Sequence, residues 1–583
     1  MKPSNDEVSP SQNMENSWRT TPFSRNMRTV DVYIRRIFWG LGLSMGVVVA
    51  YLTRYYVNGD AITYFDMAAA FRSGEWVDAV NLTYSPGYPI LLALMGFILK
   101  NDNYLFLAKG LNLFSFIVAM GACDLFVSQA YKSLQDEFKR RSLPGPVFTS
   151  ICYAAFLLSS MGWIRLQVVS PDMMVFALLL VCSTVLIKIT SNPEKFSLYG
   201  VLGLMAGLGY VFKTFFFPFS GLFFLMAVCW NRRILPAILR LSFALGAMLI
   251  ISSPVLITQS LVAGKFSYGE AGTYNYSYFV AGQGERIHSP EVLHQSPLVL
   301  SYDRGKITTY PKGADLAYWN MGIKPAMNLT AQFSAILESL DHLFGRIFLP
   351  TIAFMAWFLV QWRRNGLVRP YFFPPSVPVM LAIISLSGTF MFCLVVMEIR
   401  YVAPFVFLGF VALASLPKRQ AGEVGKYSRD FLDAGILVTV LLAVLIQSVV
   451  DQSLRCMQTI DSKKSHYDLF LETKAVSDFL NSHGVSNGDR IAIIIPFSQR
   501  LYFANLAGAR ITAEFPDTEE FLKSTPESRS NAMEALRKAG IKSIVGANPA
   551  LIQGSEMGWK SIHGAPNHFA IILNPESKNS NGH

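Results

Sequence analysis

Cysteine and charged side chains are both scarce in this sequence, and each shortage excludes a class of protein. Among 583 residues only six are cysteine and 15% are charged, whereas 52% are hydrophobic. Five of the cysteines lie inside apolar runs and none belongs to a C-x-x-C pair, which excludes a disulfide framework and a cysteine metal motif. A chain this apolar, with positive mean hydropathy, is typical of a polytopic membrane protein and not of a soluble enzyme.

Two missing motifs and the charge pattern narrow the function further. The C-terminal part has no G-x-G-x-x-G fingerprint, so we do not expect it to bind a dinucleotide. His288 and His294 lack the H-x-x-x-H spacing that would indicate a metal site. The net charge of +11 could indicate nucleic-acid binding, but Lys and Arg form short clusters between apolar spans, as topology signals do. We therefore expect the lipid bilayer, and no nucleic acid, as a partner.

Apolar runs divide most of the chain into membrane spans. Residues 1–30 are polar and are predicted to form a disordered cytoplasmic tail. Residues 31–450 contain about eleven apolar spans, which predict a membrane module with its N-terminus in the cytoplasm. External loops are expected at 58–103 and 261–340. The apolar run at 86–100 is short for a crossing and is predicted to lie as a helix at the outer surface.

The composition changes at residue 451, where apolar runs shorten and Gly, Asn, Lys and Glu become frequent. Helical and strand patterns alternate from there to the end of the chain. This alternation predicts that residues 451–583 form a small external α/β domain with a mainly parallel sheet. The fold class expected is thus a polytopic α-helical membrane protein with a C-terminal α/β domain, located in a bacterial inner (plasma) membrane.

Charged side chains gather at the predicted outer ends of the spans. The segment from Asn58 to Pro89 combines acidic and aromatic residues and ends in Pro-Gly-Tyr-Pro. Few ionisable residues lie in mid-span, with Asp124 and Lys109 the main exceptions. The residues expected at the outer face are Asp60, Asp66, Arg165, Asp172, Lys213, Glu398 and Arg400. Such a site suits a substrate with an apolar tail and a charged head, because Arg and Lys pair with phosphate while a carboxylate takes a proton from a hydroxyl.

The order of these segments resembles the GT-C superfamily of polyprenyl-phosphate-dependent glycosyltransferases. The branch is that of the protein O-mannosyltransferases and the lipid A aminoarabinose transferases. The resemblance covers about residues 35–420. Its motifs here are Asp60 with Tyr64, the run from Tyr84 to Pro89, Ser-Pro-Asp at 170–172, the run ending at Lys213-Thr214, Glu398 to Pro404, and 252–275. Where relatives often have Asp-Glu, this chain has Asp60-Ala61, so a second acid is missing and Asp66 is a possible substitute.

The resemblance implies a role for each matched residue. Asp60 would be the general base that activates the acceptor hydroxyl, and Asp172 a second external acid that orients the acceptor or the base. Partners of the lipid phosphate would be Arg165, Lys213 and Arg400. Further substrate-binding residues would be Asp66, Tyr64, Tyr84, Tyr88, Lys265, Tyr274, Asn275 and His288.

The same resemblance implies transfer of a sugar from a polyprenyl-phosphate donor to a hydroxyl of a glycan, lipid or protein, with inversion and without a cofactor. A divalent site formed by Asp60, Asp66 and Asp172 is the alternative to a metal-free reaction.

Other readings of the same residues stay open. Asp60 and Asp66 could serve only the N-terminal part of a helix, where acids are favourable. The basic residues could simply reach the lipid headgroups. A transporter or flippase for a lipid-linked substrate is the alternative function, although it would place polar residues near the midplane. An inactive scaffold with the GT-C fold is a third hypothesis, because the second acid after Asp60 is missing.

Overall fold

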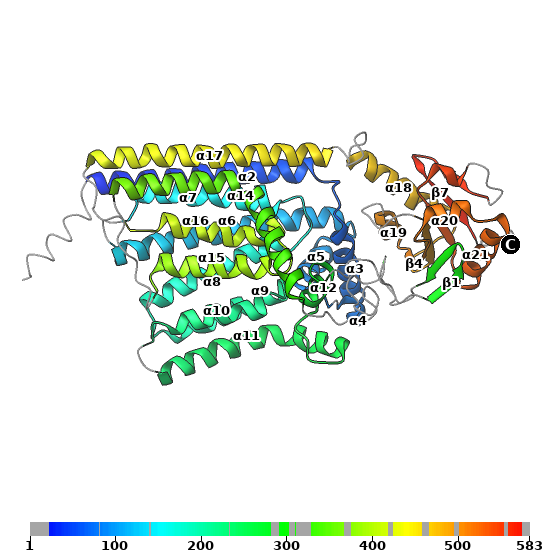
Figure 1. Ribbon diagram of the computed structural model, residues 1–583, viewed down its shortest axis with the longest axis horizontal. Coiled ribbons are helices and arrows are strands. Elements are labelled where there is room, and N and C mark those ends of the chain that lie inside the picture. The colour runs from blue at the N-terminus through cyan, green and yellow to red at the C-terminus, as the bar shows by residue number, and fades with distance from the viewer. Residues whose placement is uncertain are drawn as a thin grey trace, which may run out of the picture.

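Long apolar helices form a bundle, and a mixed α/β domain lies beyond one end of it (Figure 1). The computed structural model describes residues 22–80, 82–138, 142–231, 234–281, 291–301, 309, 328–365, 375–417, 424–457, 466–494, 501–552 and 558–573. The structural statements below concern these residues.

Seven helices in the described residues are long and apolar enough to cross a membrane. They are α2 (Pro22–Leu52), α6 (Tyr104–Phe138), α7 (Gly145–Leu157) continued by the π-helix η2 (Leu158–Ile164), α8 (Asp172–Ser191), α11 (Ile234–Ala263), α14 (Leu329–Asn365) and α17 (Val424–Met457). Four shorter apolar helices run alongside them: α9 (Phe196–Phe212), α10 (Phe216–Val228), α15 (Val377–Cys393) and α16 (Ile399–Ala414). Together they account for the eleven spans expected, and the chain is a polytopic α-helical membrane protein.

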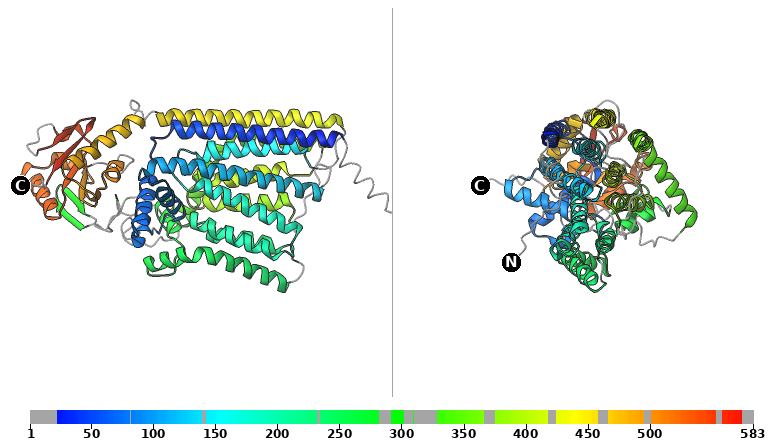
Figure 2. Two further views of the ribbon diagram at one scale, coloured as in Figure 1. Left: turned by 180° about the vertical axis from the view of Figure 1, so that it is seen from behind. Right: turned by 90° about the vertical axis from the view of Figure 1, so that its left-hand side faces the viewer.

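The helices differ in how far the bundle buries them. The most apolar stretch of the α7–η2 helix is 94% buried and that of α8 is 83% buried, so these two form the centre of the bundle. The corresponding stretches of α2, α11 and α17 are only 22% buried. Figure 2 shows α2 and α17 side by side along one edge. The apolar side chains that these outer helices leave exposed are suited to contact with lipid.

The two ionisable residues expected in mid-span find partners inside the protein. Asp124 of α6 pairs with Arg35 of α2 and accepts a hydrogen bond from the hydroxyl of Tyr153 at 2.7 Å. Lys109, also on α6, donates to the carbonyl of Gln167 at 2.7 Å. Both groups are thus satisfied by neighbouring segments, as polar groups in a membrane bundle must be.

Short helices cover the end of the bundle that faces the α/β domain. They are α3 (Gly59–Ser73), α4 (Trp76–Ala79), α5 (Gly87–Leu99) and α12 (Ala271–Phe279). The helix predicted at the outer surface is α5, and α3 packs on it. Gly87 begins α5 where a Cβ would lie 2.8 Å from the carbonyl oxygen of Val211, so only glycine allows this close approach to the end of α9.

The C-terminal domain is built on a seven-stranded sheet in the order β1-β2-β4-β3-β5-β7-β6. Its strands are β1 (Glu291–Gln295), β2 (Leu298–Ser301), β3 (Arg490–Ile494), β4 (Arg510–Glu514), β5 (Ser543–Gly546), β6 (Lys560–Ile562) and β7 (Ala565–Ile572). The helices around it are α18 (His466–Ser482), α19 (Tyr502–Ala507), α20 (Thr518–Lys523), α21 (Pro526–Lys538) and the 3₁₀ turn η4 (Pro549–Leu551).

The prediction of a mainly parallel sheet was wrong. Only β3 pairs in parallel, with β4 and with β5, and the other neighbouring strands are antiparallel. The antiparallel edges have two sources. The chain's own last strands form a hairpin on one side, and β1 and β2 reach the other side from the external loop predicted at 261–340. A pattern read along 451–583 alone could not reveal strands contributed from elsewhere in the chain.

Candidate functional site

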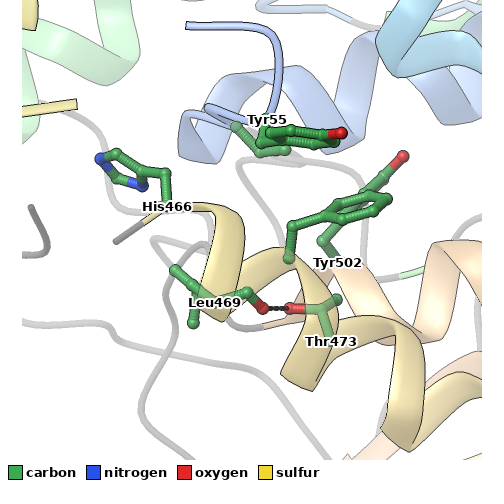
Figure 3. A pocket seen from close by; sticks show the side chains of 7 residues that line it. Tyr55, His466, Leu469, Thr473 and Tyr502 are labelled. Carbon is green, nitrogen blue, oxygen red and sulfur yellow. Dashed lines mark hydrogen bonds between the residues drawn. The ribbon is translucent and has the colours of Figure 1, made fainter. Parts of the chain in front are cut away.

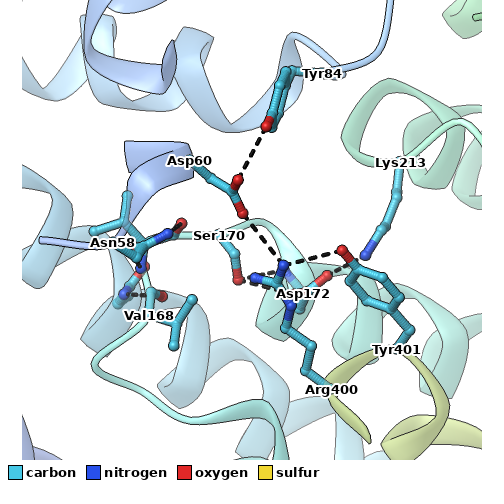
Figure 4. A network of polar contacts seen from close by, with 11 residues as sticks. Asn58, Asp60, Tyr84, Val168, Ser170, Asp172, Lys213, Arg400 and Tyr401 are labelled. Atoms are coloured by element: carbon cyan, nitrogen blue, oxygen red, sulfur yellow. Dashed lines mark hydrogen bonds and ion pairs between the residues drawn. The ribbon is translucent and has the colours of Figure 1, made fainter. Parts of the chain in front are cut away.

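A chain of ion pairs joins four segments at the end of the bundle that faces the α/β domain (Figure 4). Arg400 directs Nη2 at Asp60 Oδ2, 3.3 Å away, and Nε at Asp172 Oδ2, 3.8 Å away. Lys213 pairs with the other oxygen of Asp172, Oδ1, and the hydroxyl of Ser170 donates a hydrogen bond to Asp172 Oδ2 at 3.0 Å. Two carboxylates and two cations therefore converge from α3, α8, α9 and α16.

Each of these side chains lies at the end of a helix, where the helix dipole acts on its charge. Asp60 lies in the first turn of α3 and Asp172 is the first residue of α8, positions where the helix dipole stabilises a negative charge. Lys213 follows the last residue of α9, where a positive charge is favourable. Arg400 lies in the first turn of α16, where the dipole disfavours a cation, so its ion pairs must supply what the helix does not.

The two acids differ in exposure, which separates their chemical capacities. Asp172 is buried, with 4% of its side chain exposed, and its oxygens are occupied by Lys213, Ser170 and Arg400. Asp60 keeps 34% of its side chain exposed. Asp60 is therefore the carboxylate that an incoming hydroxyl can reach, whereas Asp172 holds the two cations in place.

Two tyrosines complete the surroundings of Asp60 and the cations. Tyr84 donates its hydroxyl to Asp60 Oδ1 at 3.0 Å, and burial together with the nearby Asp60 raises the pKa of Tyr84 well above its usual value. Tyr84 therefore stays a phenol and a hydrogen-bond donor. Tyr401 lies between the cations, with Lys213 Nζ 3.6 Å and Arg400 Cζ 4.9 Å from its ring centre.

The loop from Arg165 to Ser170, which leads into Asp172, is held by side chains of other helices. Asn58 forms a reciprocal pair with Val169, donating to its carbonyl at 3.2 Å and accepting from its amide at 2.8 Å. Asn112 donates to the carbonyls of Leu166 and Val168, both at 2.8 Å. Asn58 lies two residues before Asp60, so its amide links the segments that carry the two acids.

Arg165 is a half-buried cation at the start of this loop. It ends the π-helix η2 with φ +70°, a conformation that non-glycine residues rarely adopt and that is concentrated at functional sites. Its Nε is buried without a hydrogen-bond partner in the described part of the structure. Burial and the charges of Arg346 and Arg400 lower the pKa of Arg165, whose guanidinium nevertheless stays protonated. Arg165 and Arg346 thus add positive charge close to Arg400 and its ion pairs with Asp60 and Asp172.

The tyrosines predicted around the site form one packed group, but only one of them contacts Asp60. The Tyr64 ring lies between Tyr84 and Tyr88, with ring centres 5.4 and 5.3 Å away. Tyr88 donates its hydroxyl to Asn112 Oδ1 at 2.8 Å, inside the bundle and away from Asp60. Tyr64 and Tyr88 therefore support Tyr84 and the loop-holding Asn112.

The start of the loop predicted at 261–340 is fixed close to Tyr84. The Glu270 amide donates to the carbonyl of Leu82 at 2.6 Å, and a Cβ at Gly269, where φ is +114°, would lie 2.5 Å from the Thr214 methyl group. This contact brings α12 beside the cluster, with Tyr274 near Tyr84.

Other predicted residues lie apart from the ion-pair chain. Lys265 is largely exposed and pairs with Glu270 at 3.1 Å, and Asn275 is half-buried on α12. Asp66 is on the same helix as Asp60 but bonds to Thr309 and Asn505 instead. His288 lies outside the described residues.

Asp66 is thus apart from Asp60 and Asp172, and the described residues contain no group of three or more His, Cys, Asp or Glu side chains placed to hold a metal ion.

Sequence reasoning missed several residues of the site. Asn58 and Asn112 carry no charge, so a search for ionisable groups passes over them, although an asparagine directly before a helix that bears an acid is a usable signal. Tyr401 was seen only as part of a motif. Arg346 lies in an apolar span, and only the fold brings it beside Arg165.

The fold is similar to solved membrane glycosyltransferases. The crystal structure of ArnT from Cupriavidus metallidurans in the apo state superposes with a TM-score of 0.54 and 10% identity, over 92% of this chain and 97% of that chain. ArnT from the same organism bound to undecaprenyl phosphate gives a TM-score of 0.51 and 11% identity, over 93% and 98%. The Archaeoglobus fulgidus oligosaccharyltransferase tethered with an acceptor peptide gives 0.42 and 12%, over 87% and 69%. No family model and no curated protein matches the chain. The chain has the GT-C fold that the order of its motifs predicted.

Proposed function

We propose that this integral membrane protein is a glycosyltransferase that moves a sugar from a polyprenyl-phosphate donor to an acceptor hydroxyl at the outer membrane face. The observation that carries the proposal is the one-third-exposed carboxylate of Asp60 paired with Arg400, with Lys213 and Arg165 close to that arginine. The Nε of Arg165 has no hydrogen-bond partner among the described residues. A base and a cationic region at one membrane surface are what displacement of a lipid phosphate requires. The similarity to ArnT with bound undecaprenyl phosphate supports the same class of donor.

The reaction follows from these positions as one displacement. Asp60 takes the proton of the acceptor hydroxyl, whose oxygen forms a bond to the anomeric carbon. The bond from that carbon to the phosphate oxygen breaks, and its electron pair stays on the departing lipid phosphate. Arg165, Lys213 and Arg400 stabilise the charge that develops there. Attack opposite to the leaving group inverts the configuration at the sugar carbon.

The cations also bear on the need for a metal. Asp60 and Asp172 are already paired with Arg400 and Lys213, and in this proposal those cations meet the phosphate in place of a divalent ion. We therefore expect transfer to continue after chelation with EDTA. A complete loss of transfer that added Mg²⁺ or Mn²⁺ restores would contradict this.

Orientation follows from the charge pattern, with the N-terminus in the cytoplasm and the C-terminal domain outside a bacterial inner membrane. Reporter fusions at residues 139–141 and after residue 583 test it. Activity of a cytoplasmic reporter at the first position and of an external reporter at the second is expected. The opposite pattern would put Asp60 on the cytoplasmic side and refute the proposal.

The decisive experiment replaces Asp60 with Asn, which keeps the shape and removes the base. Membranes with equal amounts of each variant are given polyprenyl-phosphate donors with labelled pentoses or hexoses, and label in envelope glycans, lipids and proteins is counted. We expect Asp60→Asn to lower transfer by about 10²–10⁴-fold. The matched control is Glu519→Gln, an exposed external carboxylate, which should transfer normally. Absence of transfer by the wild-type protein, or full transfer by Asp60→Asn, would sink the proposal.

A further inference from the structure

The external loop and the C-terminal domain form one structural unit. Strand β2 pairs antiparallel with β4, with Leu300 opposite Glu514 and Ser301 opposite Ala513 (green and orange strands in Figure 1). Further along the loop, the carbonyl of Thr309 accepts a hydrogen bond from the amide of Ile511, on the same strand, at 2.8 Å. A segment that leaves the membrane bundle after α11 is therefore built into the sheet of a domain that follows α17. Movement of this domain must move that loop segment with it.

This combined unit rests on α3, the helix that carries Asp60. Apolar side chains of α3, α5 and α6 share one buried cluster with side chains of the C-terminal domain. Phe65 on α3 is fully buried, and its ring centre lies 5.9 Å from that of Tyr502 on α19. Just after α2, the ring of Tyr55 packs on Tyr467 and Phe470 of α18, with ring centres 4.9 and 5.0 Å apart. The domain thus shares a core with the outer end of the bundle.

The apolar contact is incomplete near α18. A small pocket remains between the end of α2 and the domain, lined by Tyr55, Val57, His466, Leu469, Phe470, Thr473 and Tyr502 (Figure 3). The hydroxyl of Thr473 bonds within its own helix, to Leu469 at 2.6 Å, and so contributes no link across the seam. Apolar packing with such a gap attracts the two parts but does not by itself fix one orientation, because hydrophobic contacts are not directional.

Directional contacts meet at Asp66. Its carboxylate accepts hydrogen bonds from the Thr309 amide at 2.7 Å, the Thr309 hydroxyl at 2.5 Å and the Asn505 amide group at 2.9 Å. Asn505 also donates to the Thr309 hydroxyl at 3.2 Å. Asp66 is 7% exposed, so these bonds form away from water, where each is geometrically demanding and costly to leave unmade. One side chain of α3 thereby joins the external loop and the C-terminal domain.

We propose that Asp66 is a positioning residue through which the loop and the C-terminal domain together hold α3, and with it Asp60, in the orientation that transfer requires. The inference rests on the proposed function. It assigns a role to the domain, which is to complete the site from outside the membrane. Docked, the unit fixes the middle of α3 while the Asn58–Val169 pair fixes its start. Undocked, α3 keeps only its contacts with the bundle.

The test uses the full-length protein and a swap of partners. Asn505→Asp places a second carboxylate against Asp66 and removes a donor. The double variant Asp66→Asn with Asn505→Asp reverses donor and acceptor and restores the pair. Asn481→Asp, an exposed position on α18, is the matched control for the added charge. Two quantities are measured: hydrogen exchange of the α3 amides, and the kcat and KM of sugar transfer.

We expect Asn505→Asp to speed α3 exchange at least about tenfold and to lower kcat by about tenfold with little change in KM, and the double variant to regain most of both. The inference would be overturned if the α3 amides of Asn505→Asp exchanged at the wild-type rate, or if they exchanged faster while kcat stayed unchanged. So would a double variant no better than the single one. Failure of the proposed function looks different, because the wild-type protein would then transfer nothing, or Asp60→Asn would stay active, while the exchange measurement would still report on docking.

Discussion

Asp60 and Asp66 are six residues apart on one helix, yet the fold gives them opposite surroundings. The spacing places them about 120° apart around α3, so they face different neighbours. Asp60 is one-third exposed and contacts a cation and a phenol. Asp66 is 7% exposed, and its hydrogen bonds with the described residues all come from neutral donors of the loop and the C-terminal domain. The same side chain can serve chemistry on one face and assembly on the other, and its neighbours decide which.

The difference extends to how each negative charge is compensated. The charge on Asp60 is matched by Arg400, which also contacts Asp172. At Asp66 the donors favour the carboxylate, but burial outweighs them and raises its pKa to about 7. Asp66 differs from a base in access and not in pKa: it is buried, and its oxygens are occupied by Thr309 and Asn505, which suits a contact between parts of the chain.

The largest effect is expected from removal of Arg400, the cation that pairs with both Asp60 and Asp172. Arg400→Gln leaves Asp60 and Asp172 facing each other with Lys213 alone, and it deletes a phosphate partner. We expect transfer to fall by about 10²–10³-fold. Arg400→Lys should recover only part of this, because an ammonium cannot direct separate donors at two carboxylates.

Arg240→Gln is a control for loss of a buried arginine from an ion pair far from the site, with the exposed Glu194, and it should change folding more than transfer per folded molecule. Transfer by Arg400→Gln at more than a tenth of the wild-type rate would contradict the assignment of Arg400.

A smaller effect is expected from Asn58→Ala, which removes both hydrogen bonds to Val169. The backbone amide and carbonyl of Val169 are then left buried and unpaired, at about 1–3 kcal/mol each. The segments of Asp60 and Asp172 would separate, so we expect about a tenfold loss of kcat and a lower unfolding temperature in detergent. Asn192→Ala, at an exposed asparagine after α8, should change neither. Equal stability and kcat in Asn58→Ala would show that the pair positions nothing.

A change of pH should affect the docking role of Asp66 without any substitution, and so distinguish it from Asp60. Burial in the docked state raises the pKa of Asp66 to about 7. Its contribution to the stability of docking is therefore fully present below about pH 4 and is lost as pH rises to about 7. Tyr104 of α6 faces Asp66, beside the pair of Arg72 and Asp102, and a tyrosine stays neutral throughout this range. Exchange of α3 amides should therefore become faster relative to the bundle between pH 5 and 7.5.

This pH dependence should be weak, since the shared apolar cluster also holds the domain. It should disappear in Asp66→Asn, which cannot titrate. An identical pH profile in Asp66→Asn and the wild-type protein would assign the change to another group.

The membrane part of the fold was readable from the sequence because span length and apolarity follow directly from the bilayer. Local patterns of charge and hydropathy predicted the helix at 87–99, the helix that carries Asp60, and the places of Arg165, Lys213 and Arg400 at helix ends. These patterns survive because each is set by a few consecutive residues.

Contacts between distant segments could not be read in this way. No local signal pairs Thr309 with Ile511, or assigns Asp66 to a domain that begins about 400 residues later. Hence the sheet was predicted as mainly parallel, and the contacts of Asp66 with Thr309 and Asn505 were not predicted. Uncharged asparagines such as Asn58 were missed for a related reason: Asn58 bonds to backbone groups of a loop that lies far along the chain.

The smallest expected effect concerns the phenol that touches Asp60. Tyr84→Phe removes one hydrogen bond of 3.0 Å and leaves the ring packed against Tyr64, so the shape of the site is kept. A single such bond is worth about 0.5–1.5 kcal/mol, which corresponds to a loss of kcat of at most about tenfold. Tyr88→Phe loses a bond of similar length to Asn112, away from the acid, and should affect folding more than kcat. If Tyr84→Phe were as inactive as Asp60→Asn, the phenol would have to take part in the proton transfer, and the division between Asp60 as base and Tyr84 as its support would be wrong.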